Sequence, residues 1–160
     1  MDRLLVGTRN SRLARVQTEI VVGRLRARFG GLAVEVREMV TTGDRILDRP
    51  LHLVGTKGMF TKELDEALLE GRIDLAVHSL KDLPGELPEG IALAAVPERG
   101  EPFDCLLAPG PVSLETLAAG TRLGTSSLRR RAQLRAHRRD LEIVDLRGNL
   151  DTRWQRLTEG

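Results

Sequence analysis

Gly124-Thr-Ser-Ser-Leu-Arg-Arg-Arg131 is the stretch that decides the fold, because a short strand turns directly into a helix inside it. Residues 121–124 form an extended run, and Ser126 or Ser127 suits the N-cap position of a helix. The composition of Leu128–His137 favours a helix that begins at the arginines. The sequence therefore predicts a strand, a tight polar turn and a cationic first helical turn.

Arginines in the first turn of a helix oppose the helix dipole, at a cost of roughly 0.3–1 kcal/mol each. A bound carboxylate or phosphate would offset this cost, and the free N–H groups at a helix start already favour anions. The alternative is that Asp or Glu side chains of the fold neutralise these arginines on a solvated face. The sequence favours the anion site and leaves the alternative open.

Composition places the chain among globular proteins with a real core, since 41% of its 160 residues are hydrophobic. The formal net charge of +2 is far from that of a nucleic-acid polycation. Cys105 is the single cysteine, which excludes an internal disulfide and a cysteine-rich metal site. No apolar run approaches the length of about 18 residues that a membrane span needs. We therefore expect a cytoplasmic protein with no membrane partner.

The N-terminal part alternates strands and helices in the order β-α-β-α-β, which implies a parallel or mixed sheet covered on both faces. One face of the first helix, which runs to about Phe29, is expected to be buried, with Leu13, Val16, Ile20, Gly23 and Ala27. The second helix is expected over Met59–Glu70, with Phe60, Leu64, Ala67 and Leu68 pointing inward and Gly71 ending it. Strands are expected at Leu4–Val6, Leu32–Val40, Ile73–Val77 and Ile91–Val96.

A second unit is expected to begin near Pro97–Pro102, where charged and turn residues cluster, which divides the chain into residues 1–97 and 98–160. Its strands are expected at Cys105–Ala108, Thr121–Gly124 and Glu142–Leu146, and its helices at Leu114–Ala119, Leu128–His137 and from Leu150 onward. This second sheet is unfinished. We expect a fragment, or a chain that another segment completes.

Ligands of open α/β sheets bind at the carboxyl ends of strands. In this chain those ends carry many cationic and hydroxyl donors and few acids, so two facing units would form a cleft for a ligand with several carboxylates or phosphates. Asp82 is the exception, and the adjacent Lys81 favours its charged form. Asp82 then either steadies a cationic intermediate or serves as a structural ion-pair partner or cap.

Other candidate residues favour structural roles. His78 has no second ligand at metal spacing, so a hydrogen-bonded structural histidine is expected rather than a metal site. Cys105 has apolar neighbours and is expected to be a buried, inert thiol. The arginine-rich segment Leu128–Asp140 lacks the aromatic residues and the wide basic surface of a nucleic-acid binder.

Several motifs together closely resemble the porphobilinogen deaminase (hydroxymethylbilane synthase) family, in family order over essentially the whole chain. They are Thr8-Arg9-x-Ser11, Thr42-Gly43-Asp44, Lys57-Gly58-x-Phe60-x-Lys62-Glu63-Leu64, Val77-His-Ser-Leu-Lys-Asp-Leu-Pro84, the Gly124–Arg130 turn and Leu146-Arg-Gly-Asn149 with Thr152-Arg153. The resemblance implies stepwise condensation of four porphobilinogen units into linear hydroxymethylbilane, with release of ammonia, on a covalent dipyrromethane cofactor.

The resemblance also implies a fold and a role for individual residues. Two of the family's three domains resemble the doubly wound lobes of periplasmic binding proteins, and the second would be incomplete here. By motif, Asp82 would stabilise the cationic azafulvene that forms when ammonia leaves. Cofactor carboxylates would be held by Lys81, Thr125, Ser126, Ser127, Arg129, Arg130, Arg147 and Gly148. Substrate or the growing chain would be bound by Arg9, Ser11, Arg147 and Arg153. A mobile loop over Arg45–Gly58, flanked or lined by Asp44, Lys57 and Phe60, would cover the cleft.

The chain departs from the family pattern at a few places. Leu53 stands where a lysine is common in the loop, and Arg12 where proline is common. The family's cofactor-bearing cysteine lies in a C-terminal domain to which no part of this chain corresponds, and Cys105 does not match it. By this pattern the chain alone is inactive and needs a C-terminal segment or a second chain.

Two further hypotheses belong to other classes of protein. A non-catalytic anion-binding module of the periplasmic-binding-protein type would share the fold and the donors, and a secretion signal would favour it. A nucleic-acid binder is the more distant one, and a steep salt dependence of oligonucleotide binding would favour it.

Overall fold

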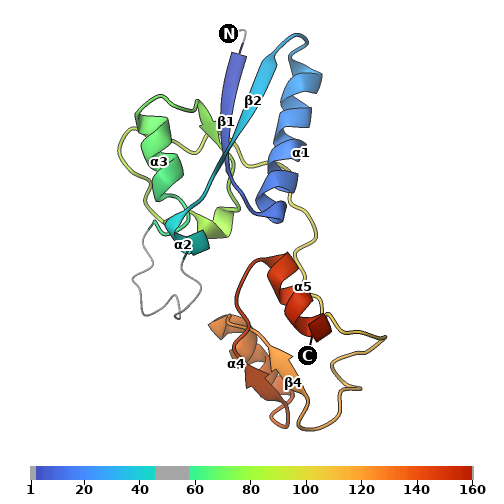
Figure 1. Ribbon diagram of the computed structural model, residues 1–160. Coiled ribbons are helices and arrows are strands. Elements are labelled where there is room, and N and C mark those ends of the chain that lie inside the picture. Colours follow the sequence, from blue (N-terminus) through green and yellow to red (C-terminus); the bar gives the residue numbers. More distant parts are fainter. Residues whose placement is uncertain (1–2, 46–57, 160) are drawn as a thin grey trace. The chain divides into compact units, whose positions relative to one another are not determined.

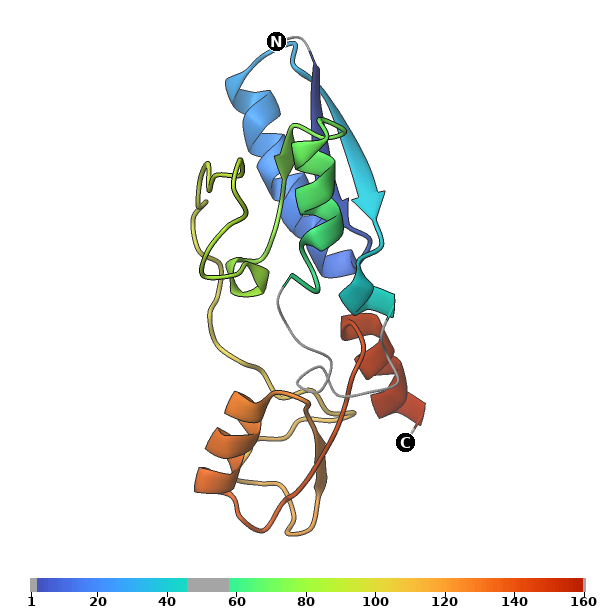
Figure 2. The same ribbon diagram turned by 90° about the vertical axis from the view of Figure 1, so that its left-hand side faces the viewer.

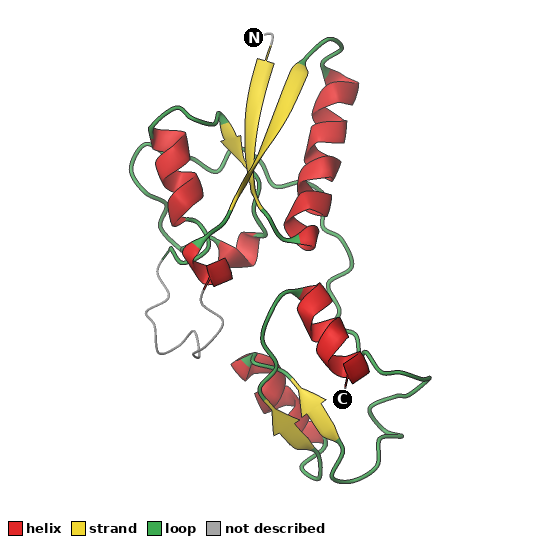
Figure 3. Cartoon of the chain, in the orientation of Figure 1, coloured by secondary structure: helices red, strands yellow, loops and turns green. Residues whose placement is uncertain are grey.

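The structure is a computed structural model that describes residues 3–45 and 58–159. Contacts divide the chain into two compact units, residues 1–98 and 99–160. Both units contain helices and strands (Figure 3). No helix in the described ranges is long and apolar enough to cross a membrane.

Unit 1 is a parallel three-stranded sheet with a helix on each face (Figures 1 and 2). Its strands β1 (Arg3–Arg9), β2 (Ala33–Met39) and β3 (Leu75–Ala76) lie in the order β2-β1-β3. Helix α1 (Arg12–Arg28) covers one face and α3 (Lys62–Leu69) the other. Of the two arrangements expected from the element order, a parallel or a mixed sheet, the structure has the parallel one, and the carboxyl ends of all three strands lie at one edge.

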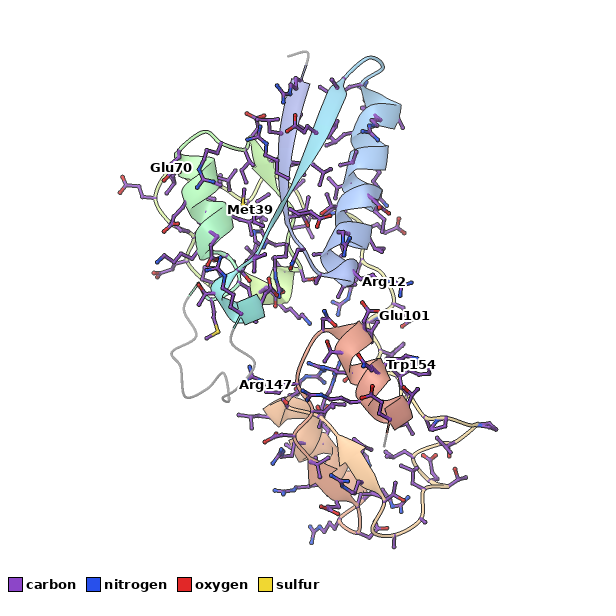
Figure 4. The ribbon with its side chains drawn as sticks, viewed as in Figure 1. Arg12, Met39, Glu70, Glu101, Arg147 and Trp154 are labelled. Carbon is purple, nitrogen blue, oxygen red and sulfur yellow. The ribbon has the colours of Figure 1, made fainter. Side chains whose placement is uncertain are left out.

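Successive side chains of β1 point to opposite faces of the sheet, so they contact α3 on one face and α1 on the other. Leu5 packs with Met39 against the core of Leu64, Ala67 and Ile73 on the α3 side. The Met39 side chain lies between β2 and α3 in Figure 4. On the other face, the buried Thr8 hydroxyl accepts a hydrogen bond from Thr18 of α1 at 2.8 Å.

The predicted buried face of α1 is wrong. Leu13, Val16 and Ile20 are each about half exposed, and Thr18 and Val22 are the buried residues of the helix. Gly23 and Ala27 are exposed as well. Thr18 can be buried because its hydroxyl has two acceptors within reach, Ala14 O at 2.9 Å and the Thr8 hydroxyl at 2.8 Å. A polar side chain with nearby hydrogen-bond acceptors is thus buried at a position where the hydrophobic pattern alone would not predict burial.

Unit 2 contains two parallel strands, β4 (Arg122–Gly124) and β5 (Glu142–Val144), joined through α4 (Leu128–His137). Helix α5 (Leu150–Glu159) follows. The two helices begin at the residues predicted for them. Among the described residues of this unit, only Leu141 and Thr125 are buried, so its core is small.

Three predicted elements are absent from the described residues. Ile91–Val96 and Cys105–Ala108 are irregular rather than strands, and Leu114–Ala119 contains turns in place of a helix. A strand needs a neighbour to satisfy its N–H and C=O groups, and none pairs with either segment. Cys105 is consequently exposed, not buried as expected.

Candidate functional site

The carboxyl edge of the unit 1 sheet brings together three predicted site residues. Arg9 is the last residue of β1, and Asp44 lies in α2 (Thr42–Arg45), just after β2. Asp82 ends the short helix η2 (Leu80–Asp82), which follows β3. Parallel strands thus collect residues that lie up to 73 positions apart in the sequence.

Arg9 forms ion pairs with both acids. Its Nε lies 3.3 Å from Asp44 Oδ2, and its Nη2 contacts Asp44 Oδ1. Its Nη1 lies 3.3 Å from Asp82 Oδ2. The guanidinium also stands 4.2 Å from the centroid of the Phe60 ring. The three charged side chains are only 16–20% exposed, so solvent screens this cluster less than it would screen surface pairs.

The cation beside Asp82 is therefore Arg9 and not Lys81, which corrects the prediction from sequence. Lys81 is exposed and forms no ion pair within the described parts of the chain. Side chains of adjacent residues in a short 3₁₀ helix point in different directions, so nearness in sequence does not bring them into contact.

Asp44 is tied to the turn that precedes it. Its Oδ2 accepts hydrogen bonds from Thr41 N, at 3.2 Å, and from Thr41 Oγ1, at 2.7 Å. Burial raises the pKa of Asp44, but the hydrogen bonds from Arg9 and Thr41 outweigh burial and leave the pKa below its ordinary value. The carboxylate is therefore held in its charged form.

Ser11 and Arg12 define the start of α1. Ser11 is the N-cap, and its Oγ accepts a hydrogen bond from Ala14 N at 3.3 Å. Arg12 is the first helical residue, a position that suits proline because no N–H is needed there, so arginine in place of the family's common proline leaves the helix start intact. Lys57, Leu53 and nearly all of the predicted mobile loop lie outside the described residues.

His78 is not the hydrogen-bonded histidine that was expected. Both of its ring nitrogens are buried and have no hydrogen-bond partner among the described residues. Burial lowers the pKa of His78, although Asp65 and Asp82 act in the opposite direction. No group of three or more possible metal ligands occurs within residues 3–45 and 58–159.

The hydroxyl-rich turn of unit 2 joins β4 to α4. Ser127 is the N-cap of α4, and its Oγ accepts a hydrogen bond from Arg130 N at 3.4 Å. Ser126 Oγ donates to Leu146 O at 2.9 Å, which ties the turn to the end of β5. Thr125 is 4% exposed, and its Oγ1 accepts from Ser127 N at 3.2 Å. These contacts fix the backbone from which the arginines project.

Acids of the fold pair with the arginines of the first turn, as the alternative reading allowed. Asp104 contacts both Arg129, at 3.0 Å, and Arg130, and these hydrogen bonds lower the pKa of Asp104. Arg131 pairs with Asp145 at 2.6 Å. Sequence reasoning missed Asp104, which lies in an irregular segment 25 residues before Arg129 and belongs to no motif.

Arg147 and Arg153 complete a cationic cluster near the turn. Arg153 Nε donates to Gly148 O at 2.8 Å, and burial together with the nearby Arg130 and Arg147 lowers the pKa of Arg153. Arg147 lies in the loop between β5 and α5 (Figure 4). Its Nη1 and the Nε of Arg130 are buried without a partner among the described residues. Cationic side chains with buried N–H groups that lack an acceptor are suited to an anionic ligand.

Gly148 allows this loop to turn. Its φ of 108° lies in the region that only glycine adopts readily, and a Cβ there would lie 2.7 Å from Thr152 Cβ. A side chain at this position would clash with Thr152 and strain the backbone of the loop that carries Arg147.

Comparison with known proteins gives one consistent result. The family model described as "Porphobilinogen deaminase, dipyromethane cofactor binding domain" matches residues 4–160. The porphobilinogen deaminase of Roseiflexus sp. (strain RS-1) is 55% identical over 157 residues, which are 98% of this chain and 52% of that protein. That of Nitratidesulfovibrio vulgaris (strain DSM 19637 / Miyazaki F) is 52% identical over 160 residues, 100% of this chain and 50% of that protein. The chain thus spans about half the length of the curated relatives it matches.

Proposed function

The chain belongs to the porphobilinogen deaminase family, as a portion of it, and we propose that the complete protein condenses four porphobilinogen units into linear hydroxymethylbilane with release of ammonia. We also propose that residues 1–97 and 98–160 belong to two doubly wound domains of the periplasmic-binding-protein type. The remaining length of the protein would then complete the second domain and supply the third.

Dipyrromethane carries acetate and propionate groups, and the donors of unit 2 fit such a ligand. The observation that most supports this is that Arg130 Nε and Arg147 Nη1 are buried N–H donors without an acceptor in the described structure. Each charge-assisted hydrogen bond to a carboxylate would contribute about 1.5–3 kcal/mol. Lys81, Arg129, Ser127 and Gly148 would add contacts, while Thr125 and Ser126 would hold the turn in place.

The cofactor, when bound, would supply the pyrrole carbon on which the product chain is built. Asp82 is assigned the catalytic role, because its carboxylate can accept a hydrogen bond from a pyrrole N–H of the substrate. It can also stabilise the positive charge that develops as ammonia leaves porphobilinogen. Asp82 Oδ2 accepts from Arg9, and no further hydrogen bond to this carboxylate occurs among the described residues. One of its oxygens is thus left for the substrate.

Substrate carboxylates are assigned to Arg147 and Arg153, with Ser11 and Arg9 beside the sheet edge of unit 1. Arg153 keeps its charge despite burial, since arginine stays protonated at neutral pH even with a lowered pKa. Ser11 would contribute its hydroxyl proton, because the oxygen already accepts from Ala14 N.

The activity is tested with the complete protein and porphobilinogen. We expect ammonia and hydroxymethylbilane to form in a ratio of four to one. Tight binding of porphobilinogen without any ammonia release would contradict the proposal and would favour the non-catalytic anion-binding module.

We predict that Asp82→Asn lowers kcat of the complete protein by at least about 10²-fold, the scale of one preorganised electrostatic group. An amide keeps an acceptor but loses the charge, so Asp82→Glu should retain more activity. Asp74→Asn is the matched control, because Asp74 Oδ2 accepts from Leu5 N at 2.8 Å, away from the site. Turnover of Asp82→Asn at the wild-type rate, with the cofactor attached, would show that Asp82 is structural.

A further inference from the structure

Arg9 makes two hydrogen bonds with Asp44 and one with Asp82. The two oxygens of Asp44 accept hydrogen bonds from two guanidinium nitrogens, Nε and Nη2. Asp82 accepts a hydrogen bond only from Nη1, which lies 3.3 Å from Asp82 Oδ2. A two-point pair fixes the plane of a guanidinium, whereas a single long contact does not. Asp44 is therefore the partner that determines where Arg9 lies.

Asp44 can fix Arg9 because Asp44 is itself held. Thr41, which is fully buried, donates both its N–H and its hydroxyl to Asp44 Oδ2. The following residue, Thr42, donates its N–H, at 2.8 Å, and its hydroxyl to Glu63 Oε1 in the first turn of α3. The short helix α2 is thus attached to α3, and the carboxylate of Asp44 has little freedom to follow a moving arginine.

Phe60 packs against the face of the Arg9 guanidinium. The ring centroid lies 4.2 Å from Arg9 Cζ. Gly43 brings the α2 backbone against the same ring, and a Cβ at this position would overlap it. Arg9 is therefore held by Asp44 at its side and by an aromatic ring on its face, with only Nη1 directed to Asp82.

We propose that Asp44 is a positioning residue, which keeps Arg9 from forming a two-point ion pair with Asp82 and so leaves one oxygen of the Asp82 carboxylate, with its negative charge, accessible to substrate. This inference rests on the catalytic role proposed for Asp82. It assigns to Asp44 a function in the chemistry rather than in covering the cleft.

Replacing Asp44 by Asn leaves one acceptor oxygen and removes the charge, so at least one donor of Arg9 is freed, and Asp82 is the other acid that Arg9 contacts among the described residues. Arg9 can then donate to both oxygens of Asp82, which offsets the negative charge that the reaction needs and blocks access of the substrate to this carboxylate. We expect Asp44→Asn to lower kcat of the holoenzyme roughly 10-fold or more, on the scale of a misplaced catalytic group. KM should rise less than kcat falls, since Asp44 itself is assigned no substrate contact and only Arg9, one of several residues assigned to substrate carboxylates, is displaced.

A double-mutant cycle tests whether Asp44 acts through Asp82. In the Asp82→Asn background, Asp44→Asn should cause no further loss of kcat, because the charge that it protects is already gone. Asp74→Asn, the matched control, should leave kcat unchanged in both backgrounds. Additive losses, a change confined to KM, or wild-type kcat for Asp44→Asn would each overturn the proposal.

The NMR signal of the Arg9 Nε–H group gives a readout that does not depend on turnover. Asp44→Asn should shift this signal and speed its exchange with water, whereas Asp74→Asn should not. An unchanged signal in Asp44→Asn would overturn the positioning role. If Asp82→Asn turns over like wild type, the catalytic assignment of Asp82 fails by itself, and the Arg9 signal still decides whether Asp44 holds the arginine.

Discussion

Arginines in this chain have two very different surroundings. Arg9 donates to both Asp44 and Asp82, whereas Arg147 keeps a buried Nη1 that meets no acceptor among the described residues. The sequence identified both as candidates through residue type and position after a strand. It also named Asp44 and Asp82 but could not pair them with Arg9, because pairing across 35 or 73 positions depends on which strands become neighbours. The candidate residues were thus predictable and their partners were not.

We predict that Arg147→Leu in the complete protein reduces retention of the cofactor while changing the free energy of unfolding by less than about 1 kcal/mol. Replacing an unsatisfied buried donor by an apolar group costs little, since no hydrogen bond is lost. Thermal unfolding of the apoprotein and the mass of the purified holoprotein measure the two effects.

Arg138→Leu is the matched control in the same unit. Arg138 donates to Leu114 O and Leu117 O and pairs with Asp140, so its loss should lower stability and leave cofactor retention unchanged. Equal behaviour of the two variants would mean that Arg147 is structural.

Helices of this chain were easier to predict than strands, because a helix carries its hydrogen bonds and caps within its own segment. The predicted start of α4 was confirmed with Ser127 as N-cap, and Gly71 follows α3 with a positive φ of 68°. Ile91–Val96 has the composition of a strand but no neighbouring strand to pair with in the described structure. A strand depends on a partner elsewhere in the chain, and local pattern does not contain that information.

At α4, substitution of Ser127 separates capping from anion binding. Ser127→Ala removes the acceptor for Arg130 N and should lower the free energy of unfolding by about 1 kcal/mol. Ser127→Asp keeps a good N-cap, so stability should stay near wild type, but its charge should repel ligand carboxylates and reduce cofactor retention. Denaturant unfolding of the apoprotein and holoprotein mass test both variants. Normal cofactor retention in Ser127→Asp would place the ligand away from this turn.

At the scale of the whole molecule, the sequence motifs predicted the family more reliably than the hydrophobic pattern predicted the elements. They span both units, 1–98 and 99–160, and the family model matches the same range. Unit 2 buries only Leu141 and Thr125 among its described residues and leaves Phe103 82% exposed. A small core of this kind gives little hydrophobic pattern for sequence analysis to detect, which is why the two elements predicted at Cys105–Ala108 and Leu114–Ala119 are absent from the described structure.

Cofactor attachment is the last property to be tested, and it concerns the complete protein. The expectation that Cys105 is inert because it is buried is wrong, since the side chain is exposed and lies next to Asp104. The resemblance to the family still implies another attachment site, because Cys105 does not match the family's cofactor-bearing cysteine. This chain spans about half of the length of its relatives. We predict that Cys105→Ser in the complete protein retains the full mass of the attached cofactor and wild-type kcat, and that the isolated 160-residue chain gains no covalent adduct from porphobilinogen. Intact mass spectrometry measures both. Loss of the adduct in Cys105→Ser, or an adduct on the isolated chain, would place attachment at Cys105 and contradict the assignment.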